Sequence, residues 1–393
     1  MKHKAFFLLV TGLAMASFAP CSNGNAETEL LSLKNTYKNE FLIGVSVKDS
    51  QFMAKNPAET AFVKGQFNSI TPENLLKWDA VHPQLGKYRF EESDRFIEFG
   101  NKNGMFIIGH TLVWHSQTAD WVFKNAQGGD VDRETLLARM RDHIQTVVGR
   151  YKGRVRGWDV VNEIMEENGS LRKSPWQKII GEEYIAKAFQ FAHEADPTAE
   201  LYYNDYRLEV PGKRKGAIAL LRKLKAAGVT VTGVGLQGHY DLNWPKPQEV
   251  DETIADFGRL GLKVMITELD VDVLPSRPGG AGNADVSRKE AADPKLNPYK
   301  TALPEAMQQK LARRYAELFG VYLKHRGTLS RVTFWGLTDG DSWLDNFPIK
   351  GRTNYPLLFD RSYHAKPAYF AVIDAVPVAP VNSPSQPQPA VRR

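Results

Sequence analysis

Two glutamates, Glu163 and Glu268, stand at the ends of apolar segments and have the side chains that acid–base chemistry requires. Glu163 ends the segment RGWDVVNE at residues 156–163, and Glu268 lies in KVMITELD at residues 263–270. These segments give no packing reason for a charged side chain. A pair of carboxyl groups can hydrolyse a glycosidic bond, because one protonates the leaving oxygen while the other attacks the sugar carbon or activates a water. The residues alone leave these two routes open.

Polar and aromatic residues also end most of the other apolar segments. One buried polar residue in such a place is usually a satisfied structural group, whereas a set that converges indicates a site. The residues concerned are Glu73, Asn74, Lys77, His110, Trp114, His115, Asn162, Asn204, Asp205, Tyr206, Gln237, His239, Asp270 and Trp335.

Eight short segments rich in apolar and β-branched residues alternate with stretches of helical periodicity. Near-continuous apolar strands are typical of parallel sheets covered on both faces, and eight of them alternating with helices predict a (β/α)8 barrel. In such barrels the site lies at the carboxyl ends of the strands, where the residues named above converge. The eight segments are residues 41–47, 67–70, 105–114, 156–163, 200–206, 233–239, 263–270 and 331–337.

An open doubly wound sheet is the alternative arrangement of the same elements. A nucleotide site in such a sheet needs a glycine-rich turn after the first strand, but Gly44 stands alone there. No composition break divides residues 27–375, and we therefore expect one catalytic barrel domain over that range.

The charge of the chain does not favour nucleic acid as a partner. The 51 Lys and Arg residues exceed the 45 Asp and Glu residues by a net charge of +6, and the excess is spread along the chain. The densest basic stretch, residues 213–225, has helical periodicity. We expect its charges on a solvated outer face and its apolar residues, Ile218, Leu220, Leu221 and Leu224, on the inner face.

Both ends of the chain differ in composition from the barrel segments. Residues 1–26 have a basic start, a short apolar run and small residues before Ala26, which predicts a cleaved signal peptide and a secreted or periplasmic protein. The alternative is a lipoprotein anchored through Cys21, but Pro20 occupies a position where lipidation signals want a small residue. Residues 376–393 are rich in Pro, Ser and Gln, and we expect a disordered tail there. No segment reaches the ~18 apolar residues of a membrane span.

Seven motifs resemble those of the family 10 glycoside hydrolases, the (β/α)8 endo-β-1,4-xylanases. The resemblance runs from about residue 28 to residue 375, and the motifs occur in the order of the family. They are ENLLKW, GHTLVWH, WDVVNE, YYNDY, GLQGH, ITELDV and WGLTDGDSW.

This resemblance implies a retaining endo-1,4-β-xylanase that acts on xylan and xylo-oligosaccharides, works as a monomer and needs no cofactor or metal. It implies that Glu163 is the general acid/base and Glu268 the nucleophile, that Asp270 orients His239, which donates to Glu268, and that Asn162 binds the sugar 2-hydroxyl. It also implies a cis peptide bond after His110. The substrate-binding residues that it implies are Glu73, Asn74, Lys77, His110, Trp114, Asn162, Tyr206, Gln237, His239, Trp335 and Trp343.

Several positions and alternatives remain open at this level. Another retaining β-1,4-glycanase, acting on cellulose or mannan, is the nearest rival, whereas a sugar-binding protein without turnover would lack one of the two glutamates. His110, His115 and His239 lack the helical spacing of a zinc site, and we expect no metal. The residues that are either ligands or supporting groups are His115, Asp205, Asp339 and Asp341.

The long connection at residues 274–307 follows the segment that carries Glu268. A connection of this length without periodicity is usually functional or disordered. We expect it to overhang the carboxyl ends of the strands and to shape the site through Tyr299 or Arg277.

Overall fold

The structure is a computed structural model and describes residues 31–53, 56–277, 286 and 289–377. The predictions for residues 1–26 and for residues 378–393 of the tail lie outside this part of the chain. In the described residues the strands are β1 (Leu42–Val47), β2 (Ser69–Pro72), β3 (Phe106–Val113), β4 (Gly157–Asn162), β5 (Glu200–Asp205), β6 (Gly233–Leu236), β7 (His239–Asp241), β8 (Lys263–Asp272) and β9 (Leu329–Phe334).

Eight of these strands form a closed parallel barrel. The neighbours run from β6 through β5, β4, β3, β2, β1 and β9 to β8, and β6 pairs with β8 to close the ring. The first and last barrel strands pair in parallel, with Leu42 opposite Arg331. The short strand β7 continues the line of β6 and pairs only with β8. The predicted (β/α)8 barrel is therefore confirmed.

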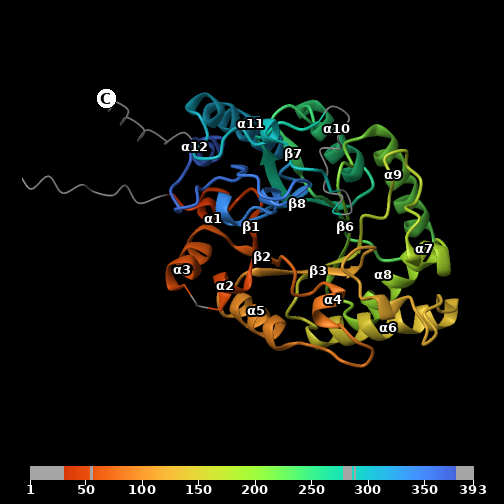
Figure 1. Cartoon of the computed structure of the whole chain (residues 1–393). Coiled ribbons are helices and arrows are strands. Elements are labelled where there is room, and N and C mark those ends of the chain that lie inside the picture. The colour runs from red at the N-terminus through yellow and green to blue at the C-terminus, as the bar shows by residue number, and fades with distance from the viewer. Residues whose placement is uncertain (1–30, 54–55, 278–285, 287–288, 378–393) are drawn as a thin grey trace, which may run out of the picture. The chain divides into compact units, whose positions relative to one another are not determined.

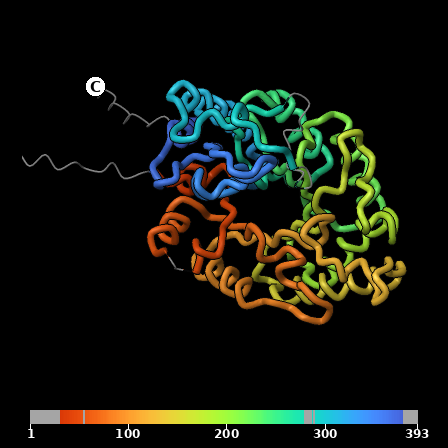
Figure 2. The backbone as a smooth tube through the Cα atoms, in the orientation of Figure 1, coloured from red at the N-terminus to blue at the C-terminus, as the bar shows by residue number. Residues whose placement is uncertain are grey.

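The helices lie outside the barrel strands, as Figure 1 shows. In Figure 2 the colour passes once around the ring, so that the first segments, in red, meet the last ones, in blue. The α-helices in the described residues are α1 (Leu33–Thr36), α2 (Asp49–Phe52), α3 (Pro57–Gln66), α4 (Trp78–Val81), α5 (Glu91–Lys102), α6 (Arg133–Arg150), α7 (Pro175–Ile179), α8 (Glu183–Ala195), α9 (Pro211–Ala226), α10 (Pro247–Gly258), α11 (Glu305–Lys324) and α12 (Pro367–Asp374). The 3-10 helices are η1 (Asp120–Val122), η2 (Pro294–Leu296), η3 (Asp339–Asp341) and η4 (Trp343–Asp345).

Local sequence signals set where these helices begin. The carboxylate of Asp132 accepts from the Thr135 backbone N–H at 2.8 Å and caps the first turn of α6. Proline, whose missing N–H costs nothing at the first helical position, opens α3, α7, α9, α10 and α12. Helices α6 and α11 bury apolar stripes against the barrel, as their periodicity predicts.

Small residues let large side chains pack between neighbouring strands. A Cβ atom on Gly109 of β3 would lie 2.1 Å from the ring of Trp158 on β4, so only glycine leaves room for this indole. Trp158 is fully buried and belongs to the hydrophobic core. We therefore expect substitution of Gly109 to displace β4, the strand that leads directly to Glu163.

The structure differs from the sequence prediction in two places that matter for the site. The segment 233–239 is broken into β6 and β7, because Gly238 takes a positive φ of 82° between them. The basic stretch 213–225 does form a helix, α9, but the expectation of a wholly solvated charged face is wrong for Lys213, which is 0% exposed. Ile218, expected on the inner face, is only half-buried.

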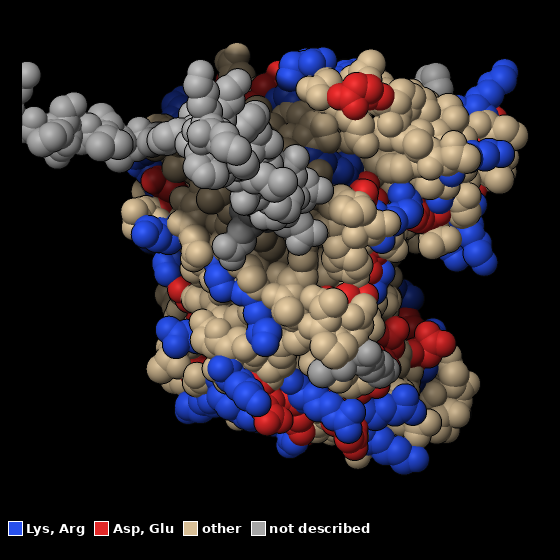
Figure 3. Space-filling model, turned by 90° about the vertical axis from the view of Figure 1, so that its left-hand side faces the viewer, with Lys and Arg blue, Asp and Glu red and all other residues tan. Residues whose placement is uncertain are grey.

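The surface carries charges of both signs side by side. On the face shown in Figure 3, Lys and Arg side chains gather along the lower edge, with Asp and Glu side chains between them. None of the helices in the described part of the chain combines the length and the apolar character needed to cross a lipid bilayer.

Candidate active site

The carboxyl ends of the barrel strands surround a cavity of about 160 Å³, which we call the central cavity. It gathers residues from segments far apart in the sequence, as the barrel prediction requires. Its described lining is Glu73, Asn74, Lys77, His110, Trp114, Gln117, Asn162, Glu163, Gln237, His239, Glu268, Val286, Trp335 and Trp343. Every residue with a predicted catalytic, supporting or substrate-binding role is brought together here, except Tyr206 and Asp270. The strand-end residues His115, Asn204 and Asp205 also lie outside this lining.

Glu163 follows β4 and is held by neutral hydrogen-bond donors. Its side chain accepts from Trp114 Nε1 at 2.8 Å and from Gln237 Nε2 at 3.0 Å. The residue is 3% exposed, and burial raises the pKa of its carboxyl group to about 7, with a further contribution from the negative charges of Asp205 and Glu268. Near neutral pH, Glu163 can therefore carry the proton that a leaving group needs.

Glu268 on β8 has surroundings of the opposite kind. One oxygen of its carboxylate lies 3.1 Å from His239 Nε2, and the other accepts a hydrogen bond from Asn204 Nδ2 at 2.8 Å. Burial alone would raise its pKa, but the hydrogen bond from His239 and the charges of His110 and His239 lower the pKa below its ordinary value. Glu268 is therefore ionised when Glu163 is protonated.

His239 owes its charge to a second carboxylate behind it. Its Nδ1 lies 3.0 Å from Asp270 Oδ1, and Trp343 Nε1 donates to the other oxygen of Asp270 at 2.7 Å. Burial by itself would lower the pKa of His239, but Asp270 and Glu268 raise it to about 10. Asp270 lies outside the central cavity and contacts the ring nitrogen of His239 that faces away from Glu268. From this position it can orient His239.

Asn204 is one of the predicted strand-end residues, but the sequence prediction gave it no role in the site. It ends β5, donates to Glu268 and accepts from Thr267 Oγ1 at 2.6 Å. Its backbone carbonyl also accepts the Glu163 backbone N–H at 2.9 Å. Asn204 therefore contacts both glutamates through different atoms. The available signal was its position at the end of an apolar segment, directly before Asp205.

One side of the central cavity is a dense polar cluster around Lys77. Its ammonium donates to Asn74 Oδ1 and Gln117 Oε1, each at 2.9 Å, and lies 5.1 Å from the ring centroid of Trp114. Glu73 lines the same side, and burial raises its pKa. Gln117, which the sequence prediction missed, has a positive φ of 44°. The cluster presents several donors and acceptors that suit sugar hydroxyls.

His110 follows the predicted backbone conformation. The peptide bond between His110 and Thr111 is cis. The imidazole Nδ1 lies 2.9 Å from Asp159 Oδ2, and the ring meets Trp335 edge-on at 5.4 Å between centroids.

Tyr206 is predicted to bind substrate but does not line the central cavity. Its side chain is 6% exposed, and the ammonium of Lys213 lies 3.7 Å from its ring centroid. Its hydroxyl also pairs with the guanidinium of Arg172. The Tyr206 ring therefore packs against the cations of Lys213 and Arg172. It is not among the described residues that line the central cavity.

The four positions left open by the sequence lie around the cavity rather than in its described lining. His115 Nε2 is 4.0 Å from Glu163 Oε2. Asp205 is buried against Lys213 at 2.7 Å, and Asp339 is buried against Lys366 at 2.9 Å. Asp341 completes the capping box of η3, because its carboxylate accepts from the backbone N–H of the N-cap residue Thr338 at 3.1 Å.

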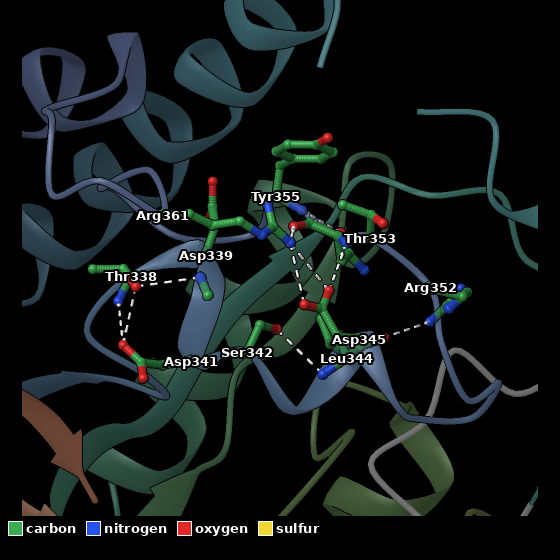
Figure 4. A network of polar contacts seen from close by, with 12 residues as sticks. Thr338, Asp339, Asp341, Ser342, Leu344, Asp345, Arg352, Thr353, Tyr355 and Arg361 are labelled. Atoms are coloured by element: carbon green, nitrogen blue, oxygen red, sulfur yellow. Dashed lines mark hydrogen bonds and ion pairs between the residues drawn. The ribbon is translucent and has the colours of Figure 1, made fainter. Parts of the chain in front are cut away.

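The loop that carries Trp343 is fixed by polar contacts, which Figure 4 shows from close by. At its start the backbone N–H and the hydroxyl of Thr338 both donate to Asp341 Oδ2, at 3.1 and 3.0 Å. Ser342 Oγ accepts from the Leu344 backbone N–H at 3.2 Å. Arg361 donates to Asp345 at 3.1 Å. These contacts hold the loop in the conformation that directs the Trp343 indole to Asp270.

A second cavity, of about 280 Å³, adjoins the central one. The two share His239 and Trp343, and Tyr299 from the connection 274–307 lines the second one. Arg277, the other residue expected to act from this connection, pairs with Glu290 at 3.2 Å. Residues 278–285 and 287–288 of the connection lie outside the described part.

The described residues contain no group of three or more His, Cys, Asp or Glu side chains arranged to hold a metal ion. The histidines of the site instead lie against carboxylates, as the contacts of His110 with Asp159 and of His239 with Asp270 show.

Comparison with known families agrees with this geometry. The profile of Glycosyl hydrolase family 10 matches residues 32–375. The chain belongs to glycoside hydrolase family 10. The match covers the whole barrel, including the strand ends that carry Glu163 and Glu268.

Named relatives of this family 10 protein extend over most of its length. It is 41% identical over 342 residues to endo-1,4-beta-xylanase A of Xylanibacter ruminicola, a match that covers 87% of this chain and 92% of the relative. It is also 41% identical over 347 residues to a beta-1,4-xylanase of Dictyoglomus thermophilum, covering 88% of this chain and 91% of the relative.

Solved family 10 structures superpose on the same region. A GH10 endoxylanase retrieved from a sugarcane soil metagenome matches with a TM-score of 0.85 and 48% identity over 87% of this chain and 99% of that one. The xylanase XynB from Paenibacillus barcinonensis matches with a TM-score of 0.78 and 38% identity, over 88% of this chain and 99% of that one.

Proposed function

We propose that this family 10 protein is a retaining endo-1,4-β-xylanase, which hydrolyses internal β-1,4-xylosidic bonds of xylan by double displacement. The observation that carries the proposal is the pair of buried carboxyl groups with pKa values displaced in opposite directions, Glu163 upward and Glu268 downward. This is the combination that a proton donor and a nucleophile need. The names of its relatives supply the substrate.

In the first step Glu268 attacks the anomeric carbon of the sugar. A covalent bond forms between a Glu268 oxygen and that carbon, while the bond to the leaving oxygen breaks and Glu163 transfers its proton to that oxygen. His239 and Asn204 keep Glu268 ionised and oriented before the attack. Trp114 and Gln237 orient the carboxyl group of Glu163.

In the second step the roles of the two groups change. Glu268 is neutral as an ester, so one negative charge that favours protonation of Glu163 has gone, and the pKa of Glu163 falls. The ionised Glu163 accepts a proton from water, which attacks the anomeric carbon and releases Glu268. Two inversions at that carbon give a product of unchanged β configuration.

The remaining lining residues supply subsites for the xylan backbone. Lys77, with Glu73 and Asn74, hydrogen-bonds the glycone sugar, and Asn162 binds the 2-hydroxyl of the sugar that is cleaved. His110 and Gln237 contact that same sugar, while aromatic rings form the walls. These wall residues are Trp114, Trp335 and Trp343.

A timed digest of unbranched xylan by residues 27–393 tests the proposal, with the anomeric configuration followed by proton NMR. We expect β-configured xylo-oligosaccharides to appear first and activity to be lost in Glu163→Ala and Glu268→Ala. Products of α configuration would overturn the double displacement. Activity confined to cellulose or mannan would keep the mechanism and overturn the substrate.

We also propose that the protein is exported after cleavage behind Ala26, and that it acts as a monomer. The basic and apolar pattern of residues 1–26 supports export. Mass spectrometry of the mature N-terminus tests this, and a diacylated Cys21 would instead establish the lipoprotein.

A further inference from the structure

The backbone around Glu163 has a conformation that its surroundings must maintain. Glu163 has a positive φ of 57°, a backbone conformation that residues other than glycine rarely adopt. Three contacts hold this turn: the Glu163 N–H donates to the Asn204 carbonyl at 2.9 Å, Arg172 Nε donates to the Glu163 carbonyl at 2.9 Å, and the Met165 N–H donates to Asp205 Oδ2 at 3.2 Å. Two of the three come from the end of β5.

Asp205 supplies one of these contacts through its side chain, and several neighbouring groups fix the position of that side chain. The Tyr203 hydroxyl donates to its Oδ2 at 2.6 Å, and the Tyr206 backbone N–H donates to its Oδ1 at 2.9 Å. The ammonium of Lys213 lies 2.7 Å from the same Oδ1, and both side chains are 0% exposed. Asp205 is therefore a fully buried carboxylate whose countercharge comes from helix α9.

Lys213 is unusual for its place in that helix. It lies in the first turn of α9, where the positive end of the helix dipole disfavours a cation. Lys215, two residues further along, is exposed to solvent, as lysines normally are. A buried ammonium is retained only when a partner compensates the loss of its hydration, and here the partner is Asp205.

We propose that Lys213 is a positioning residue for Glu163, because it fixes and neutralises Asp205, which in turn fixes the backbone just after Glu163. The proposal rests on the proposed function, in which Glu163 is the proton donor. Without Lys213, Asp205 becomes an uncompensated negative charge that favours protonated Glu163, and the tether to Met165 weakens. Glu163 is then less well positioned, so that it transfers its proton to a poor leaving group more slowly. Because Glu163 also stays protonated to higher pH, this proton transfer continues to higher pH.

Other charged and titratable groups also face this region and remain in place in such variants. They are Lys77, His115, Arg172, Glu209 and Glu268, with Tyr184 and Tyr203 beside Asp205. The pH dependence of a variant must therefore be compared with the wild-type profile and not with the behaviour of an isolated carboxyl group.

The test compares Lys213→Met with Asp205→Asn, using Lys215→Met on the exposed side of the same helix as the matched control. For each variant, kcat/KM is measured against pH on xylohexaose and on an aryl β-xylobioside with an activated phenol. Only xylohexaose needs protonation of its leaving group, so we expect Lys213→Met to reduce kcat/KM about tenfold on xylohexaose and less than about twofold on the aryl substrate. Lys215→Met should leave both unchanged.

The direction of the pH shift gives a second readout that a general loss of structure would not produce. In Lys213→Met the alkaline limb on xylohexaose should move to higher pH, and in Asp205→Asn, which removes the negative charge, it should move to lower pH. Asp205→Asn keeps the proposal testable if Lys213→Met does not fold. Equal losses on both substrates, or an alkaline limb that stays in place in Asp205→Asn, would overturn the proposal.

The variant Glu163→Gln separates this proposal from the proposed function. It should lose turnover of xylohexaose and retain kcat/KM on the activated aryl substrate. If xylohexaose turnover survives in Glu163→Gln, the role of Glu163 is wrong, whatever Lys213→Met does. If Glu163→Gln behaves as expected while the Lys213 and Asp205 variants behave like wild type, only the positioning role fails.

Discussion

Glu163 and Glu268 are nearly equally buried, at 3% and 5% exposed, and both lie at the carboxyl ends of parallel strands. Their pKa values nevertheless move in opposite directions. In the barrel, β5 and β6 separate the strands that carry them, so each has its own set of neighbours. The comparison of these two regions shows which part of the surroundings decides a protonation state.

Burial acts on both carboxyl groups in the same sense and cannot distinguish them. The donors to Glu163 are the neutral indole of Trp114 and the neutral amide of Gln237, which only partly offset burial. Glu268 faces His239, whose pKa is raised to about 10 and which therefore brings a positive charge. A charged donor outweighs desolvation where neutral donors do not.

The largest effects should come from removing each carboxyl group in turn. Glu268→Ala and Glu163→Ala should each lower kcat on xylan by about 10³-fold or more, because a nucleophile or a proton donor is lost. Added azide distinguishes the two roles on an activated aryl β-xylobioside. With Glu268→Ala, azide replaces the nucleophile and gives an α-glycosyl azide, whereas with Glu163→Ala it attacks the covalent intermediate and gives a β-glycosyl azide.

Proton NMR of the azide products checks this prediction. Products of the same configuration from both variants would mean that the two glutamates do not have the separate roles that their surroundings indicate. Gln308→Ala on helix α11, away from the central cavity, serves as a control that should retain wild-type turnover.

The second effect concerns the charge behind His239. Asp270→Asn should remove the main cause of the raised pKa of His239, so that Glu268 loses its charged donor and its pKa rises. Glu268 must be ionised to attack, and activity is lost as pH falls through its pKa. The acidic limb of kcat/KM should therefore move to higher pH, by about one unit.

Trp343→Phe provides the graded comparison for Asp270→Asn. It removes the indole that donates to Asp270 at 2.7 Å but leaves both charges in place, so its acidic limb should move less. An acidic limb that is unmoved in Asp270→Asn would show that Glu268 does not depend on the charge of His239.

Much of this arrangement can be predicted from the sequence, because in a (β/α)8 barrel the carboxyl ends of all the strands meet at one face. Glu163 and Glu268 each end an apolar segment, and eight such segments are enough to predict where their ends meet. The break between β6 and β7 was not predicted, because a lone Gly238 within an apolar segment does not reveal its positive φ. The place of Gln117 in the lining of the central cavity was not predicted either, because Gln117 lies in none of the apolar segments.

The pairings between elements could not be predicted in the same way. The sequence around Lys213 does not distinguish it from the exposed lysines on α9. Only the tertiary structure places its ammonium beside Asp205 at the end of β5. Asn204 was visible at a strand end, but its hydrogen bond to Glu268 depends on the register of β5 and β6 and on β8 beyond them. Contacts of this kind depend on tertiary geometry that periodicity does not contain.

The third effect tests the neutral donors on the Glu163 side. Trp114→Phe removes the N–H that reaches Glu163 at 2.8 Å and favours its ionised form. The pKa of Glu163 should rise above its value of about 7, and the alkaline limb of kcat/KM should move upward by about half a unit. The acidic limb reports Glu268 and should stay in place. A downward shift of the alkaline limb would contradict the assignment of Trp114 as a donor to the ionised carboxylate.

The smallest effect should come from the neutral donor on the Glu268 side. Asn204→Leu removes the amide that donates to Glu268 at 2.8 Å but leaves His239 and its charge intact. The acidic limb of kcat/KM should rise by only a few tenths of a unit, on the order of the ~0.5 kcal/mol of a weak neutral hydrogen bond. Thr267→Val serves as the control, because it removes the hydroxyl that donates to Asn204 and keeps the donor to Glu268. If Asn204→Leu shifts the acidic limb as far as Asp270→Asn does, charge is not what separates the two glutamates, and the number of donors around each carboxylate would have to explain their difference instead.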